Sequence, residues 1–384
     1  MSARWICLAL GACLSSSVAH AGLLGGFRVL PEYRSWSSTL EGDSTEVTIS
    51  QIYLPAVATL RFARTVELVV AGGFAQSELE VEDGDSWSAS GPSDVTAQLF
   101  ARFLENRLLL QAGVELPSGL RELDSEQLTV LSSLSSPLLG FPLKNFGQGL
   151  GLTGGGALAF PLGSAALGIG AGFVQRGEFV LVEDGDDFNP GDELSVSAGL
   201  DFGARAEGGA LDLGRAPLRL DAVYRTFGKD ELDGVEIFQE GAQIEAQALA
   251  QTTGRALRLW ALGRMVSKSD NKILQEAAGG QVAEIDQDAG LLTIVRGGVD
   301  FGLGKTTRIG VEGDWNQFTD AEVGALEGST YGIGPVVRVG LGRDGLLRLG
   351  AKMLGGESDP IDENDPTLEL DGLSASFALV WRPS

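Results

Sequence analysis

The stretch KNFGQGLGLTGGGALAFPLGSAALGIGAGFVQR, from Lys144 to Arg176, decides the fold. Between its two terminal cations lie 31 residues without a charge, and 10 of them are glycine. An uncharged run of this length would ordinarily predict a membrane-spanning helix. The glycines and Pro161 argue against a helix, because each interior Gly costs about 1 kcal/mol and Pro about 3 kcal/mol.

Read with a period of two residues, the same stretch becomes a pair of strands. Small residues from Gly149 to Ala159 form one face of the first strand. The other face carries large apolar side chains: Leu150, Leu152, Leu158, Phe160 and Leu162. After Gly163 a second run alternates Leu167, Ile169, Ala171 and Phe173 with glycines. Two strands with one apolar face each, joined by a tight turn, predict a β-hairpin in a membrane.

The first 21 residues predict a secretory signal peptide that is cleaved after Ala21. Arg4 precedes a short apolar core, and Ala19-His20-Ala21 has the small-x-small form of a cleavage site. Leu10-Gly11-Ala12-Cys13 resembles a lipoprotein box, an alternative that leaves only about eight apolar residues for the core. We expect residues 1–21 to be removed and residues 22–384 to form one outer-membrane domain.

Cleavage removes Cys7, Cys13 and His20, so the mature chain has neither cysteine nor histidine. Without them, disulfides, thiolate nucleophiles, ordinary zinc sites and the Ser–His–acid mechanism are excluded. We expect no enzyme, no cofactor and no metal centre. The remaining 27 basic and 52 acidic residues argue against nucleic-acid binding, which needs a basic surface. The acidic segment around Asp186 and Asp192 resembles a calcium loop only loosely.

Runs of alternating polarity recur through the mature sequence, and no linker divides it. They predict up to sixteen strands, with fourteen as an alternative: 27–37, 47–62, 65–81, 94–104, 107–117, 147–162, 164–182, 193–205, 217–228, 235–252, 255–268, 290–303, 306–318, 330–342, 345–355 and 368–382. Tight turns alternate with longer loops near 82–93, 119–146, 183–192, 269–289, 319–329 and 356–367, although 206–216 is long for a turn. This rhythm predicts an all-β fold: a single antiparallel transmembrane β-barrel with short periplasmic turns and long acidic extracellular loops.

The charges follow the same alternation. In 306–318, Ile309 and Val311 share one face, while Arg308, Glu312 and Asp314 share the other. A soluble sandwich would turn the apolar face inward, and a membrane barrel turns it outward to lipid. Parity breaks in 47–62 and 368–382 predict a β-bulge in each strand. An aromatic-rich last strand suits the barrel insertion machinery, although Arg382-Pro383-Ser384 follows it.

The charged face of this barrel would line its lumen. The candidate lumen residues are Arg102, Glu115, Arg176, Arg219, Asp221, Arg225, Arg258, Arg264, Arg296, Asp300, Arg308, Glu312, Arg338 and Arg348. Such charges either pair across strands and hold a narrow barrel rigid, or form a polar conduit that attracts anionic solutes.

The loop 119–146 is too apolar to lie in water. Leu128, Leu131 and Leu134 follow Asp124-Ser125 at helical spacing, and Phe141 lies further along. The loop would either fold into the lumen as a hatch, with the glycine-rich wall from Gly149 to Gly172 to pack on, or cap the extracellular mouth. These four apolar residues are our candidates for a gate.

Three segments resemble a known family. Gly91-Pro92-Ser93-Asp94 enters a predicted strand, and Leu116-Pro117-Ser118-Gly119 closes its partner; Phe188-Asn189-Pro190-Gly191-Asp192-Glu193 precedes another. This resembles outer-membrane proteins assigned to the phenol meta-cleavage degradation pathway, distantly like long-chain fatty acid outer-membrane transporters. Ser118 replaces the threonine of the family pattern. The resemblance covers residues 90–200 and implies a barrel that admits small hydrophobic or aromatic compounds, without defining solute-binding residues.

The sequence therefore predicts a porin-like transporter of the bacterial outer membrane that passes small hydrophobic, aromatic or anionic molecules by passive diffusion. The alternative is a structural or surface-interaction barrel with a closed lumen. The expected partners are outer-membrane lipid and lipopolysaccharide, the barrel insertion machinery and a small-molecule solute.

Overall fold

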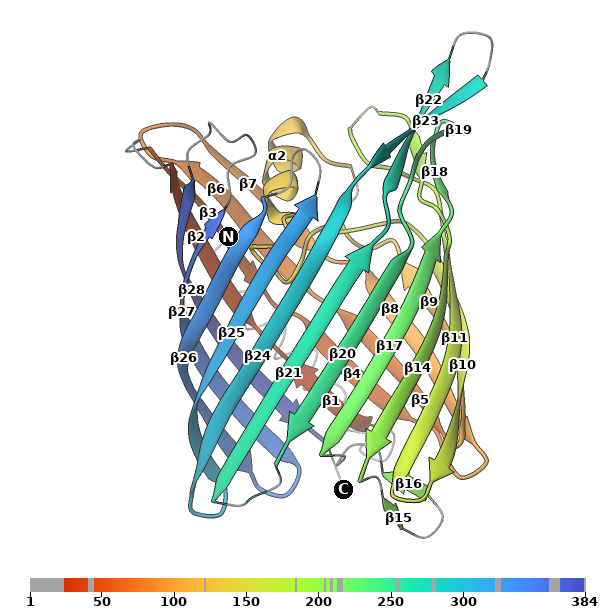
Figure 1. The fold of residues 1–384 in the computed structure, drawn as a ribbon, viewed down its shortest axis with the longest axis vertical. Coiled ribbons are helices and arrows are strands. Elements are labelled where there is room, and N and C mark those ends of the chain that lie inside the picture. The colour runs from red at the N-terminus through yellow and green to blue at the C-terminus, as the bar shows by residue number, and fades with distance from the viewer. Residues whose placement is uncertain are drawn as a thin grey trace.

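The computed structural model describes residues 24–40, 45–120, 122–183, 185–203, 205–207, 210–212, 217–252, 254, 256–277, 281–321, 326–358 and 367–382. The predicted signal peptide lies outside them. Within these ranges antiparallel strands close into a barrel, because the last strand pairs with both halves of the first (Figure 1).

Twelve strands cross the barrel wall unbroken. They are β9 (Leu108–Leu116), β10 (Gly151–Leu162), β11 (Ala165–Arg176), β14 (Glu193–Phe202), β17 (Leu218–Phe227), β20 (Gln243–Gln251), β21 (Leu257–Lys268), β24 (Ala289–Leu303), β25 (Thr307–Ala321), β26 (Gly328–Leu341), β27 (Gly345–Ser358) and β28 (Leu368–Trp381).

The first four crossings are each split into two strands. The pairs are β1 (Leu24–Val29) with β2 (Glu32–Leu40), β3 (Glu46–Tyr53) with β4 (Ala56–Arg61), β5 (Val66–Gly72) with β6 (Phe74–Val81), and β7 (Ser86–Pro92) with β8 (Val95–Phe103). The described residues thus make sixteen crossings, which confirms the predicted all-β barrel and favours sixteen strands over fourteen.

The predicted tight hairpins are present. In β10 and β11 the register runs without a shift from Leu162 opposite Ala165 to Gly151 opposite Arg176. Gly163 turns the chain with φ +64°, a conformation that favours glycine. All short turns of this kind lie at one end of the barrel in Figure 1, and the long loops lie at the other. By the rule for outer-membrane barrels, these are the periplasmic and extracellular ends.

Several predicted loops contain strands of a second sheet, which stands on the extracellular rim (Figure 1). Its members are β12 (Phe179–Val180), β13 (Asp187–Asn189), β18 (Lys229–Leu232), β19 (Val235–Gln239), β22 (Asn271–Ala277) and β23 (Gln281–Gln287). The predicted strand 235–252 is therefore two strands of different sheets. The chain passes between them at Gly241, where a Cβ atom would lie 1.9 Å from the carbonyl oxygen of Ser269.

The long periplasmic segment 206–216 is explained by a small hairpin of β15 (Arg205–Glu207) and β16 (Ala210–Asp212). The described helix is α2 (Ser125–Leu134), inside the loop between β9 and β10. No helix among the described residues is long and apolar enough to cross a membrane.

The outer face of the barrel carries an apolar belt. Leu162 and Val196 expose 54% and 53% of their surfaces there, and Leu158 lies opposite Ile169 on neighbouring strands. A closed barrel has no free edges, and an exposed apolar belt of this kind is what lipid covers. The predicted orientation, with apolar side chains outward and charges inward, is confirmed for these strands.

The polarity reverses on the extracellular part of the wall formed by β2, β3, β6 and β7. Trp36, Ile49 and Leu79 point inward and are buried, whereas Gln76 and Glu80 point outward and are exposed. This part of the wall has a core on its inner side and a polar surface on its outer side, as soluble sheets have.

This reversal corrects the two predicted β-bulges. The pairings of β3 with β2 and β6, and of β28 with β27, run without a register shift. Ile49 and Leu370 face inward and Ile52 and Leu373 outward because the apolar side of the wall changes along each strand. Each interruption of the alternation therefore marks the point along the strand where the apolar face changes from the inner to the outer side of the barrel.

Candidate channel lumen

Residues 117–120 and 122–150, called the hatch below, fold into the extracellular half of the barrel. Asp124 caps α2 as predicted: its carboxylate accepts the backbone N–H of Gln127 at 2.8 Å, and the Gln127 side chain accepts the N–H of Asp124. Leu131 and Leu134 of α2 are buried, and Leu128 packs beside them.

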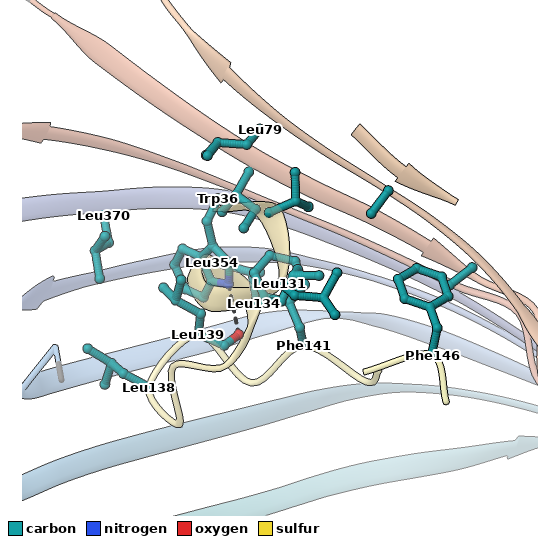
Figure 2. Packing of buried hydrophobic residues seen from close by; sticks show 14 of the residues in the cluster. Trp36, Leu79, Leu131, Leu134, Leu138, Leu139, Phe141, Phe146, Leu354 and Leu370 are labelled. Carbon is teal, nitrogen blue, oxygen red and sulfur yellow. Dashed lines mark hydrogen bonds between the residues drawn. The ribbon is translucent and has the colours of Figure 1, made fainter. Parts of the chain in front are cut away.

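The hatch and the wall share one hydrophobic cluster (Figure 2). From the hatch come Leu123, Val130, Leu131, Leu134, Leu138, Leu139, Phe141 and Phe146, and from the wall come Trp36, Ile49, Ala75, Leu79, Ala89, Phe318, Leu354 and Leu370. Of the two placements that the sequence left open, the hatch takes the one inside the barrel.

One detail of the prediction is wrong: the hatch does not pack on the glycine-rich wall. Its apolar partners lie on the inner faces of β2, β3, β6, β7, β25, β27 and β28. The glycines and alanines of β10 and β11 offer little surface to bury. Apolar contact area, not free space, decides where the loop settles.

Polar side chains of the wall hold the tip of the hatch by its backbone. Trp36 Nε1 donates to the carbonyl oxygen of Leu139 at 2.9 Å, in the pair drawn in Figure 2. The Arg34 guanidinium donates to the carbonyls of Leu139 and Gly140. These contacts satisfy backbone groups that the barrel removes from water.

Two further wall residues hold the hatch on either side of this tip. Gln51 exchanges two hydrogen bonds with the backbone of Leu143, at 2.8 and 3.1 Å. Thr330 Oγ1 donates to the carbonyl oxygen of Leu138 at 3.2 Å.

A single carboxylate closes the base of the hatch. Asp94, only 8% exposed, accepts the backbone N–H of Gly119 and of Gln148, each at 2.7 Å. Its own N–H donates to the carbonyl oxygen of Phe146. Gly119 and Gln148, with 28 residues between them, are thereby joined through one side chain.

This clamp gives a physical reason for the motif pair noted in the sequence. Ser118 Oγ accepts the N–H of Val95 at 2.9 Å, beside Asp94. A Cβ on Gly119 would lie 2.1 Å from the carbonyl oxygen of Phe146, so no larger residue fits there without a shift. The sequence identified these residues by resemblance but gave them no task.

The predicted lumen charges of β24 to β27 come together in one ion-pair network. Arg338 bonds to Asp300 and Glu312, and Arg348 bonds to Glu312. Lys352 bonds to Asp314 in the same layer. Asp300 is fully buried, so this side of the lumen is filled by paired charges.

A second chain of pairs follows the opposite wall. Arg225 bridges Glu193 at 3.3 Å and Glu245 at 3.0 Å, and Glu245 also meets Arg264 at 2.8 Å. Four further predicted residues also form ion pairs here: Arg102 with Glu67, Arg176 with Glu193, and Arg219 with Asp221 and with Asp201.

The other four predicted lumen residues have different surroundings. Arg258 donates to Gln251 at 2.9 Å, and Arg308 to the carbonyl oxygen of Gly254 at 3.2 Å. Arg296 faces a cavity of about 390 Å³ beneath the hatch tip. Glu115 lies beside Gly151 at the base of the hatch and has no ion pair among the described residues.

A larger cavity, of about 900 Å³, opens along the periplasmic half of the lumen. Its small-residue wall comes from β10, β11 and β14 and includes Ala157, Ala159, Gly168, Ser197 and Gly199. The glycine-rich stretch that decides the fold thus leaves this side of the barrel empty. The rest of the lining contains pairs of arginines and carboxylates, periplasmic turn residues and aliphatic side chains such as Leu109.

The extracellular sheet contains one perturbed carboxyl group. Asp230 of β18 accepts the N–H of Gly191 at 2.7 Å. Burial raises the pKa of Asp230, and this hydrogen bond opposes the rise. Among the described residues no group of three or more His, Cys, Asp or Glu side chains is arranged to hold a metal ion.

Comparison with known proteins gives only distant likenesses. No family model matches the sequence, and no curated protein matches it. The solved CymD monoaromatic hydrocarbon channel is similar over 93% of this chain and 88% of its own, with 11% identity and a TM-score of 0.39. A deltaS2 mutant of the TodX monoaromatic hydrocarbon channel covers 94% and 90%, with 13% identity and a TM-score of 0.42.

OccK2 of Pseudomonas aeruginosa, solved in complex with glucuronate, is similar over 92% of this chain and 98% of its own. The identity is 14% and the TM-score is 0.40. Likenesses of this size do not assign the chain to a family.

Proposed function

We propose that this protein is a passive channel of the bacterial outer membrane, in which the hatch limits the passage of small solutes. The observation that carries the proposal is a closed barrel with an apolar outer belt, a charged inner face and a lumenal cavity of about 900 Å³. Water-filled lumens lined by charge are the route by which outer-membrane barrels pass small polar molecules.

The hatch suits a gate because it is one segment inside the extracellular half of the barrel, attached at its base, at its tip and through the shared hydrophobic cluster. The clamp at Asp94 holds its base. Side chains of the wall hold the backbone of residues 138–143 near its tip through hydrogen bonds: Arg34, Trp36, Gln51 and Thr330. Such a segment can move as a unit, as active-site lids do, when these bonds and the apolar contacts of the cluster separate together. Leu128, Leu131, Leu134 and Phe141 are the apolar residues that such opening would expose.

The solute is small and enters from the extracellular side. The resemblance noted in the sequence favours hydrophobic or aromatic compounds, and the charged inner face favours anions. Lipopolysaccharide and lipid would surround the belt, and the barrel insertion machinery would place the chain in the membrane.

A closed structural barrel is the second candidate, because the hatch and the two ion-pair networks fill much of the lumen. Planar-bilayer recording separates the two functions. A channel gives stepwise conductance, whereas a closed barrel gives none.

Deletion of residues 124–142 tests the gate. We expect the deleted protein to show a larger unit conductance or a higher open probability than the full chain. Deletion of residues 273–285 from the β22–β23 hairpin, which projects above the rim in Figure 1, is the control. Unchanged conductance after the hatch deletion would end the gating proposal.

A further inference from the structure

The large cavity at the periplasmic end carries two cations that the lumen does not neutralise. Each acidic lining residue has an arginine neighbour within the barrel: Glu67 has Arg61 at 3.1 Å and Arg102 at 2.9 Å, and Asp221 has Arg219 at 2.8 Å. Asp201 also lies 3.7 Å from Arg219, and Glu245 has the two partners described above.

Arg64 and Arg107 line the same cavity without such partners. They sit in the adjacent β4–β5 and β8–β9 turns at the periplasmic rim, and both are exposed. Among the described residues neither guanidinium has an ion pair or a side-chain hydrogen bond. A neutral solute would gain nothing from two such groups, whereas an anion would gain from both.

The wall beside these arginines has a different chemistry. Ala157, Ala159 and Gly168 present only methyl groups or backbone to the cavity, and Leu109 adds an aliphatic side chain. A Cβ at Gly168 would meet its nearest atoms only at 4.0 Å, so space remains in front of this wall. A flat or short apolar body can therefore lie there without displacing a charged side chain.

Building on the proposed function, we propose that this cavity is a binding site for small organic carboxylates. The carboxylate lies between the guanidinium groups of Arg64 and Arg107, and the apolar body lies on the wall of Ala157, Ala159 and Gly168. Pairing of arginine with a carboxylate supplies the orientation, and the small residues supply the room. The site would hold the solute at the periplasmic end of its path.

The probe pair for this site is benzoate and benzamide, which share a shape and differ in charge. Binding to the full chain in detergent micelles is measured by titration calorimetry, with empty micelles subtracted. We expect benzoate to bind about fivefold more tightly than benzamide, the range expected for two exposed charge contacts. Equal binding of the two probes to the native protein overturns the site.

The double variant R64Q/R107Q should lose this preference. The matched control is K305Q/R343Q, which removes two exposed cations from other turns of the same rim, outside the cavity lining. We expect the control to keep the preference. Equal losses in both double variants would show that general surface charge, not this site, attracts the anion.

A second pair of variants tests the apolar wall. Gly168→Phe should weaken binding of both probes, because its ring enters the cavity. Gly154→Phe adds the same ring on the lipid side, where a Cβ would meet nothing within 4 Å, and should leave binding unchanged. Native affinity in Gly168→Phe places the ligand elsewhere and overturns the proposal.

These outcomes are distinct from failure of the proposed function. Preferential benzoate binding without any stepwise conductance would reject the channel and keep the site. Conductance without the preference would reject the site and keep the channel.

Discussion

The clamp at Asp94 gives the sharpest test of how the hatch is held. In Asp94→Asn the side-chain oxygen can still accept one backbone N–H, but the new amide group faces the second N–H, donor against donor. One of the 2.7 Å bonds, to Gly119 or to Gln148, is therefore lost, and the other no longer has a charged acceptor. Bonds to charged groups contribute about 1.5–3 kcal/mol each, so the docked hatch should lose about 2–4 kcal/mol.

Because about 1.4 kcal/mol corresponds to a factor of ten, opening of the hatch base should become about 30-fold to 1000-fold more frequent. Amide hydrogen exchange of residues 119–148 measures this directly, and single-channel recording should show longer open periods. Glu115→Gln is the matched control, since it removes a neighbouring lumenal carboxylate that makes no bond to the hatch. Native exchange rates in Asp94→Asn, or equal acceleration in Glu115→Gln, would refute the clamp.

Three further variants probe other parts of the molecule. Trp36→Phe removes the bond to the Leu139 carbonyl and should destabilise the hatch tip by about 1–3 kcal/mol, seen as faster exchange near residue 139 while the barrel's heat-modifiable mobility on gels stays native. Glu312→Gln frees two guanidinium groups from their shared carboxylate and should shift the reversal potential in a salt gradient toward anion selectivity; an unchanged potential would place this network off the ion path. Asp230 has a raised pKa, so the folded sheet holds its proton more tightly than the unfolded chain does, and stability falls as pH rises from the ordinary carboxyl pKa through the raised one. Asp230→Asn keeps an acceptor for the Gly191 N–H and should abolish this dependence in exchange rates of β18 and β19 between pH 4 and 7; a persistent dependence would assign it to another group.

The strand rhythm of the sequence was enough to predict the barrel. Alternation in 147–162 and 164–182 placed Leu158 and Ile169 outward and the glycines inward, because a strand has only two faces and lipid covers one. The helix after Asp124 was also predictable, since capping and helical spacing are local signals.

The contacts of the hatch could not be predicted in this way. In the sequence, Ile49 and Leu370 interrupt the alternation of their strands. They face inward because they pack against the hatch, a segment far away in the chain. Only the folded barrel brings Trp36 beside Leu139, a separation of 103 residues. Where a distant segment covers a strand, the strand's own pattern no longer tells which side faces water.

For the candidate site, too, local pattern predicted the orientation of side chains but not their contacts. Alternation alone predicted that Arg338, Glu312 and Arg348 point inward. Their pairing also depends on how far along the barrel axis each residue lies, and the register between neighbouring strands sets that position. The sequence placed Arg64 in a turn and Arg107 at the start of the predicted strand 107–117, and nothing in it indicated that both residues line one cavity.

A channel requires that one face of these strands meets lipid and that the other encloses water. Two adjacent residues of β10 test this in a mature chain that the predicted cleavage leaves without cysteine: Thr153→Cys on the inner face and Gly154→Cys on the outer face. Labelling in intact outer membranes with a charged, water-soluble thiol reagent should modify the first variant and spare the second. Rapid labelling of Gly154→Cys with protection of Thr153→Cys would reverse the barrel's two faces and contradict the channel.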